Sequence, residues 1–100
     1  MESGLRVRFV QVALGLMASG QPEQMPALDE IFAELRRDQP TWRVEVGRAA
    51  TTRTIQVQAQ APELDEALRL VKTELERLLG QSSLESPPDL RWARPRQVTL

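Results

Sequence analysis

The pentapeptide PALDE at residues 26–30 recurs as PELDE at residues 62–66. Each copy opens with proline, which suits the first position of a helix because a missing N–H group costs nothing there. The Asp and Glu that follow fall in or near the first turn, where the positive end of the helix dipole favours carboxylates. The two pentapeptides therefore predict two helix starts. We interpret their paired carboxylates as start signals rather than as a catalytic or metal-binding pair.

Apolar residues recur with helical spacing after both pentapeptides. The first stripe consists of Leu28, Ile31, Phe32 and Leu35. Pro40 prevents this helix from continuing. The second stripe consists of Leu64, Leu68, Val71, Leu75, Leu78 and Leu79. Gly80 predicts the end of the second helix, since glycine is common at helix C-termini. Two i,i+4 pairs of opposite charge are predicted on its exposed side, Asp65 with Arg69 and Lys72 with Glu76.

Alternating apolar and polar residues predict strands before, between and after the two helices. The segments are Leu5–Leu14, Thr41–Val46, Arg53–Ala59 and Leu90–Leu100. The short link at residues 47–52 favours an antiparallel hairpin between the middle two segments. Pro95 lacks a ladder donor, so the last segment either lies at a sheet edge or ends early. The first segment is apolar on both sides, with Leu5, Val7 and Phe9 on one and Val10, Val12 and Leu14 on the other.

The predicted order is strand, helix, strand, strand, helix, strand. This order resembles the ferredoxin-like split β-α-β superfold, in which two helices cover one face of a four-stranded antiparallel sheet. We expect one α+β domain over residues 1–100, with a loop at residues 81–89 and a flexible tail at residues 94–100. The first strand is central in this arrangement, which accounts for part of its two-sided apolar character. A superfold does not specify function.

The composition excludes several kinds of chemistry. The 100 residues include no Cys and no His, so disulfides, thiolate sites and catalytic triads built on His cannot form within this chain. The formal net charge of −1 gives no long-range field that would attract nucleic acid or an anionic membrane. We expect a protein that is not an enzyme and that holds no cofactor and no metal ion.

The most apolar run of the chain extends from Val10 to Ala18. It is interrupted by Gln11 and Gly15 and is too short to cross a bilayer. It also alternates like a strand, unlike the continuous apolar core of a signal peptide. We therefore expect a cytoplasmic protein with no membrane partner.

The first predicted strand carries more apolar residues than a half-exposed strand needs, and contiguous exposed apolar surface is typical of interaction sites. We expect a non-catalytic protein–protein interaction or adaptor module that binds itself, as a homodimer or larger assembly, or a larger partner protein. Contact would be made through the helix-free sheet face or through an exposed edge strand. The predicted face consists of Val10, Val12 and Leu14 with a polar rim of Arg6, Arg8 and Arg43. The alternative is a β-bulge that returns Val10 and Val12 to the core.

Two other functions remain open. A predicted loop at residues 15–25 contains glycines that could form an anion-binding turn before a helix, as in a sensor domain for amino-acid-type ligands. Its candidate ligand residues are Gly15, Ser19 and Gly20. The helix-free sheet face could instead bind single-stranded RNA, but it lacks the aromatic residues on which bases stack, which makes nucleic acid an unfavoured partner. Its expected residues are Arg6, Arg8, Val10, Val12, Arg43, Glu45, Thr54, Gln56 and Gln58.

Overall fold

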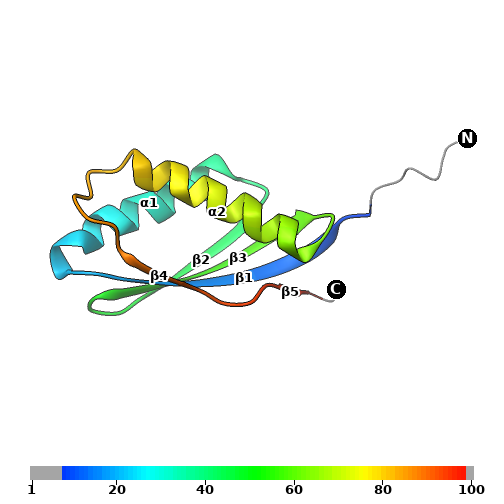
Figure 1. The fold of residues 1–100 in the computed structure, drawn as a ribbon, viewed down its shortest axis with the longest axis horizontal. Coiled ribbons are helices and arrows are strands. Elements are labelled where there is room, and N and C mark those ends of the chain that lie inside the picture. Colours follow the sequence, from blue (N-terminus) through cyan, green and yellow to red (C-terminus); the bar gives the residue numbers. More distant parts are fainter. Residues whose placement is uncertain (1–7, 99–100) are drawn as a thin grey trace, which may run out of the picture.

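Two helices lie across one face of an antiparallel sheet (Figure 1). The computed structural model describes residues 8–98. In chain order its elements are β1 (Val10–Ser19), the 3-10 turn η1 (Pro22–Gln24), α1 (Met25–Asp38), β2 (Arg43–Arg48), β3 (Thr52–Ala61), α2 (Leu64–Gly80), β4 (Asp89–Trp92) and β5 (Arg96–Gln97). The sheet order is β2-β3-β1-β4, and β5 also pairs with β1. The predicted mixed α+β class, with an antiparallel sheet and two helices, is confirmed.

The core lies between the sheet and the two helices. The predicted stripe of α1 is buried in full, and Val71, Leu75 and Leu78 of α2 are buried with it. The helix-facing residues of β3 alternate with exposed or half-exposed ones along the strand, as period-2 geometry requires. They are Arg53, Ile55, Val57, Ala59 and Ala61. The predicted hairpin is confirmed, because β2 and β3 pair antiparallel across a short turn.

The first strand differs from its prediction in its bounds and in which of its residues face the helices. It begins at Val10 and continues to Ser19. Leu5 and Val7, which were predicted to belong to it, lie outside the described residues. It pairs with β3 in one unbroken register from Val10 to Ser19, so the alternative of a β-bulge at Val10 and Val12 is also wrong. Its helix-facing side carries Val10, Val12, Leu14, Leu16 and Ala18.

Charge pairs along α2 also differ from prediction. Arg69 pairs with Glu66, one turn earlier, rather than with Asp65. The ammonium group of Lys72 lies over the Trp92 ring, 5.6 Å from its centroid, instead of pairing along the helix. This cation–π contact joins the helix to β4, which a helix-only pattern could not indicate.

The C-terminal segment lies at an edge of the sheet and also ends its strand early, so both predicted forms occur. β4 ends at Trp92, and a second short strand, β5, resumes after Pro95. Proline has no N–H group to give to the ladder, so the strand ends early, as predicted. The predicted loop at residues 81–89 ends one residue sooner, because Asp89 already belongs to β4. Within the predicted tail, residues 96–97 pair with β1.

Candidate functional site

Strand β2 forms one edge of the sheet, because the strand order ends there. At the hairpin turn the Ala49 N–H donates to the Thr52 carbonyl at 3.0 Å, which makes these two residues a hydrogen-bonded pair. Hydrogen-bonded and non-hydrogen-bonded pairs alternate along an antiparallel ladder. The backbone groups of Val44, Val46 and Arg48 therefore point away from β3, out of the sheet. These three residues offer a second strand a place to pair.

Helix α1 supports this edge through Arg36. The Arg36 Nη2 donates to the outward carbonyl oxygen of Val44 at 2.8 Å. A carbonyl oxygen has two lone pairs, so the Val44 carbonyl can still accept a bond from another strand. The contact fixes the last turn of α1 against the strand and holds the edge in one position.

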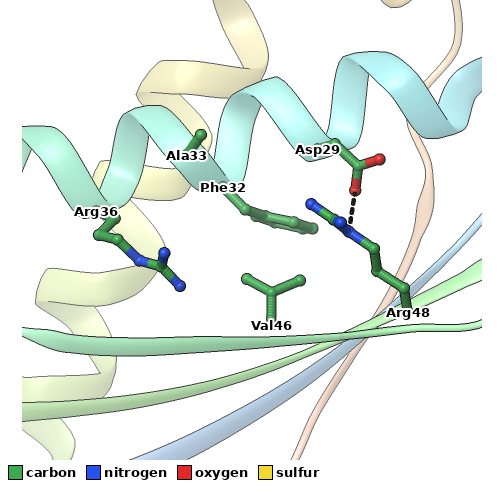
Figure 2. Close-up of a pocket in the computed structure, with 6 residues that line it drawn as sticks. All are labelled: Asp29, Phe32, Ala33, Arg36, Val46 and Arg48. Carbon is green, nitrogen blue, oxygen red and sulfur yellow. Dashed lines mark ion pairs between the residues drawn. The ribbon is translucent and has the colours of Figure 1, made fainter.

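A groove of about 400 Å³ lies between α1 and β2. It is lined by Asp29, Phe32, Ala33, Arg36, Val46 and Arg48. Figure 2 shows the Phe32 ring extending from α1 toward Val46, with the guanidinium groups of Arg36 and Arg48 on either side. Side chains alternate between the two faces of a strand, so a chain paired with β2 would place every second side chain beside this groove.

Asp29 is the acidic member of the groove, and two arginines from the hairpin approach it. Its carboxylate accepts hydrogen bonds from Arg53 at 2.7 Å (Nε) and 3.2 Å (Nη2). The Nε of Arg48 lies 3.6 Å from Oδ1, as the dashed line in Figure 2 marks. The hydrogen bond from Arg53 is the main cause that lowers the pKa of Asp29 below its ordinary value. The Asp29 carboxylate is therefore held charged and hydrogen-bonded to the hairpin.

Arg53 links this carboxylate to the hairpin turn. Its side chain is nearly buried, and its Nη1 donates to the carbonyls of Ala49 and Thr52 at 2.5 and 3.1 Å. The Asp29 carboxylate raises the pKa of Arg53 through their hydrogen bond. One guanidinium therefore ties the turn that precedes β3 to α1, which fixes the angle between the groove's two walls.

The two pentapeptides begin their helices differently. Neither proline occupies the predicted first helical position. Pro26 is the second residue of α1, and Pro62 precedes Glu63, the N-cap of α2. Asp65 and Glu66 lie in the first turn of α2, where the dipole favours them. In α1 the first turn holds no acidic residue, and Asp29 instead bonds to Arg53. The prediction that both acidic pairs fall in or near the first turn is confirmed, since Asp29 and Glu30 directly follow the first turn of α1.

The predicted interaction face is wrong in its apolar part. Val12 and Leu14 are 0% and 2% exposed and belong to the core, and Val10 packs against it. The physical reason is the position of β1, whose even-numbered residues face the helices. Of the predicted rim, Arg6 lies outside the described residues, whereas Arg8 and Arg43 are exposed.

The predicted ligand loop at residues 15–25 is also wrong in extent. Gly15 lies within β1, where its carbonyl accepts from the Ala93 N–H at 2.8 Å. Ser19 is the last residue of the same strand. The space beside Gly20 is occupied by the Gln24 side chain, whose Oε1 accepts from the Gln21 N–H at 2.7 Å. Gly15 therefore allows the neighbouring chain at Ala93 to approach closely, and Gly20 leaves room for the Gln24 side chain.

The helix-free face of the sheet is mostly polar. Residues of β1, β2 and β3 on this face include Gln11, Met17, Arg43, Glu45, Thr54, Gln56, Gln58 and Gln60. Arg43 and Glu45 pair with each other across 3.5 Å, and both side chains are largely exposed. The predicted residues of the helix-free face are confirmed for β2 and β3. Val10 and Val12 were also predicted on this face, and that prediction is wrong. Within residues 8–98, no helix is long and apolar enough to cross a membrane.

Most groove residues could not be recognised as a site from the sequence. Phe32 is predicted as core, and Val46 as the inner face of a strand. Arg36 falls near the end of the first predicted helix, where the pattern gives no sign of a site. Their juxtaposition depends on the sheet order, which places β2 at an edge beside α1. Contact through an exposed edge strand was predicted, but the sequence patterns did not identify β2 as that strand.

A scan against models of protein families found no match, and a search of curated proteins also found none. Among solved structures, the de novo designed protein Foldit4 is similar, with 16% sequence identity and a TM-score of 0.46. The likeness covers 93% of this chain and 99% of that chain. At this TM-score it carries no argument about function.

Proposed function

We propose that this chain is a non-catalytic protein-interaction module that binds an extended segment of protein along the free edge of β2. The observation that carries this proposal is the outward direction of the backbone groups of Val44, Val46 and Arg48 beside the α1–β2 groove. Unpaired strand edges are templates for another strand, and many modules use them to bind peptides.

We assign the fold to the ferredoxin-like split β-α-β class. The order β2-β3-β1-β4, with antiparallel pairing between all neighbours, supports this assignment. In this class the second strand lies at a sheet edge, which makes β2 the strand available to a partner. The opposite edge is less suitable, since Pro95 interrupts the segment that forms β4 and β5.

The binding mode that fits is strand addition. Main-chain hydrogen bonds to β2 would give affinity, and the groove would read alternate side chains of the bound segment. The half-buried Val46 offers it a small apolar surface beside the buried ring of Phe32. Arg36 and Arg48 would favour acidic or polar side chains near the rim, although Asp29 already offsets part of the charge of Arg48.

The test compares two substitutions at Val46. Val46→Pro removes the outward N–H donor but leaves the hydrogen bonds between β2 and β3 intact, because those belong to the neighbouring residues. Val46→Ala is the matched control, since it shortens the same side chain and keeps the donor. Thermal unfolding followed by circular dichroism establishes that both variants are folded.

A phage-displayed library of random decapeptides serves as the probe. We expect enriched peptides to shift the amide NMR signals of β2 and of the groove, and to bind Val46→Pro at least about tenfold more weakly than Val46→Ala. Enriched peptides that bind the two variants equally, or that shift signals elsewhere on the sheet, would contradict the proposal. A library that yields no binder would contradict it too, unless β2 is occupied by a second copy of the chain.

A further inference from the structure

We infer that the segment bound by β2 is β2 of a second copy of this chain, paired antiparallel about a two-fold axis at Val44. The inference rests on the proposed function, because it names the occupant of the same edge. Two-fold interfaces join the same surface of two copies, so this edge must complement itself. The sequence of β2 allows that requirement to be tested register by register.

Axes at residues 47 and 48 pair only Val46 and Arg48 of β2 and leave Val44 out. Three symmetric registers pair the outward backbone groups of Val44 with those of β2 in the second copy. Their two-fold axes lie at Val44, Glu45 and Val46, because residues with outward groups must pair with residues of the same kind. The three registers differ in which side chains lie opposite one another. Directly opposite side chains attract or repel across the pair, and like charges opposite one another are destabilising.

Two of these registers are less favourable in charge. With the axis at Glu45, this residue lies opposite Glu45 of the second copy, a pair of like charges. With the axis at Val46, Val44 lies opposite Arg48 of the second copy. In this register Glu45 lies opposite Gly47 and Arg43 lies opposite Ala49 of the second copy, so no pair of opposite charges forms between the strands. The first register therefore sets like charges opposite each other, and the second gains no attraction between charges.

The register with its axis at Val44 is complementary on the helix-free face. It places Arg43 opposite Glu45 of the second copy, and Glu45 opposite Arg43 of that copy. Within one chain these two side chains already lie 3.5 Å apart and are largely exposed. Pairing would therefore form a cluster of four charges of alternating sign. It gains cross-strand attraction and buries no lone charge.

The helix-covered face is complementary in the same register. Val44 lies opposite its own counterpart, and Val46 lies opposite Trp42 of the second copy. Both Val46 and Trp42 are partly buried hydrophobic residues that pack at the margin of the core. The Trp42 indole of the second copy would extend over Val46, which lines the groove. Apolar surface that is half-exposed in one copy is thereby covered by the other.

The backbone can make the bonds that this register requires. The N–H and carbonyl of Val44 face those of Val44 in the second copy. The Val46 N–H faces the Trp42 carbonyl of the second copy. The Trp42 N–H is already donated to the Gln39 carbonyl at 3.0 Å, so the ladder ends at this residue. A short ladder with charged flanks predicts a reversible dimer of a single register rather than open-ended aggregation.

Charge reversal provides the first test. Arg43→Glu and Glu45→Arg each replace attraction by repulsion at both symmetric positions, and each should weaken dimerisation by about tenfold or more in sedimentation equilibrium. The double exchange Arg43→Glu with Glu45→Arg should restore the dimer, and a mixture of the two single variants should form a heterodimer. Arg91→Glu is the control, because Arg91 is exposed on β4 at the other side of the sheet.

Cysteine cross-linking tests the register itself, since the natural chain contains no Cys. The register at Val44 predicts that a mixture of Arg43→Cys and Glu45→Cys protein forms a mixed disulfide under mild oxidation, because these positions lie opposite each other. Glu45→Cys protein alone should cross-link only weakly. Efficient cross-linking of Glu45→Cys protein with itself would instead indicate the axis at Glu45 and overturn the inference.

The remaining outcomes separate this inference from the proposed function. A wild-type chain that stays monomeric at millimolar concentration overturns the second copy as occupant. The proposed function then stands if library peptides bind along β2 and Val46→Pro weakens them. A dimer that survives Arg43→Glu, Glu45→Arg and Val46→Pro unchanged forms elsewhere, and it overturns the inference as well.

Discussion

Asp29 is the residue on which the local geometry of the groove depends. It joins α1 to the hairpin through the two hydrogen bonds from Arg53, and it lies 3.6 Å from Arg48 on the groove wall. The sequence alone presents Asp29 as one of five acidic residues in two similar pentapeptides. Its different role arises because Arg53, distant in the sequence, faces α1 in the folded sheet.

Substitution of Asp29 should destabilise the fold. Asp29→Ala leaves the nearly buried Arg53 guanidinium without its carboxylate, and we expect a loss of about 1–3 kcal/mol in the free energy of unfolding. Urea denaturation measures this loss. The control is Glu30→Ala, the exposed neighbour, which should change the free energy by less than about 0.5 kcal/mol. Equal effects of the two variants would show that the Asp29 contact contributes nothing specific.

The hydrogen bond between Asp29 and Arg53 also predicts how the stability of the fold depends on pH. The pKa of Asp29 is lowered in the folded state, mainly by the hydrogen bond from Arg53. Its stabilising contribution is therefore complete above the ordinary aspartate pKa of about 4, and it is lost as the pH falls through the depressed folded value. The stability difference between wild type and Asp29→Asn should be constant near neutral pH and should narrow in acid. A difference that widens as the pH falls would contradict this assignment.

At the scale of elements, patterns confined to one segment were sufficient for the helices and the hairpin. The stripe of α1 and the alternation of β2 and β3 each reflect one buried face, and both were predicted correctly. The position of β1 was predicted wrongly. Residues 5–9 and 10–18 both alternate, and a single sequence does not decide which of the two stretches pairs with β3. Gly15 was read as a loop residue although it lies inside the strand, beside Ala93.

Two substitutions that introduce the same charge on opposite faces of β1 test which of its residues face the helices. Val12→Asp places a carboxylate in the core, where an unpaired charge costs several kcal/mol, so we expect no cooperative thermal transition. Met17→Asp on the same strand introduces the same charge on the helix-free face, where Met17 is 44% exposed. This variant should unfold within a few degrees of wild type. If circular dichroism shows that the Val12→Asp protein is folded, the burial of Val12 in the core is contradicted.

At the scale of the whole molecule, the sheet edge is the feature that segment patterns could not supply. Strand order determines which backbone groups remain free, and it brings Arg36 of α1 to the carbonyl of Val44. The sequence predicted association but assigned it to residues that the core uses. The residues of β2 instead combine an unpaired edge, a groove and a charge pattern that matches itself in one register.

Amide hydrogen exchange, measured by NMR in dilute and in concentrated protein, tests this claim most directly. The N–H groups of Val44 and Val46 point out of the sheet at the β2 edge, whereas that of Leu90 points out at the β4 edge. We predict that exchange at Val44 and Val46 slows as the protein concentration rises, while exchange at Leu90 stays constant. Exchange at Val46 that is independent of concentration, or slowing at Leu90 instead, would contradict pairing through β2.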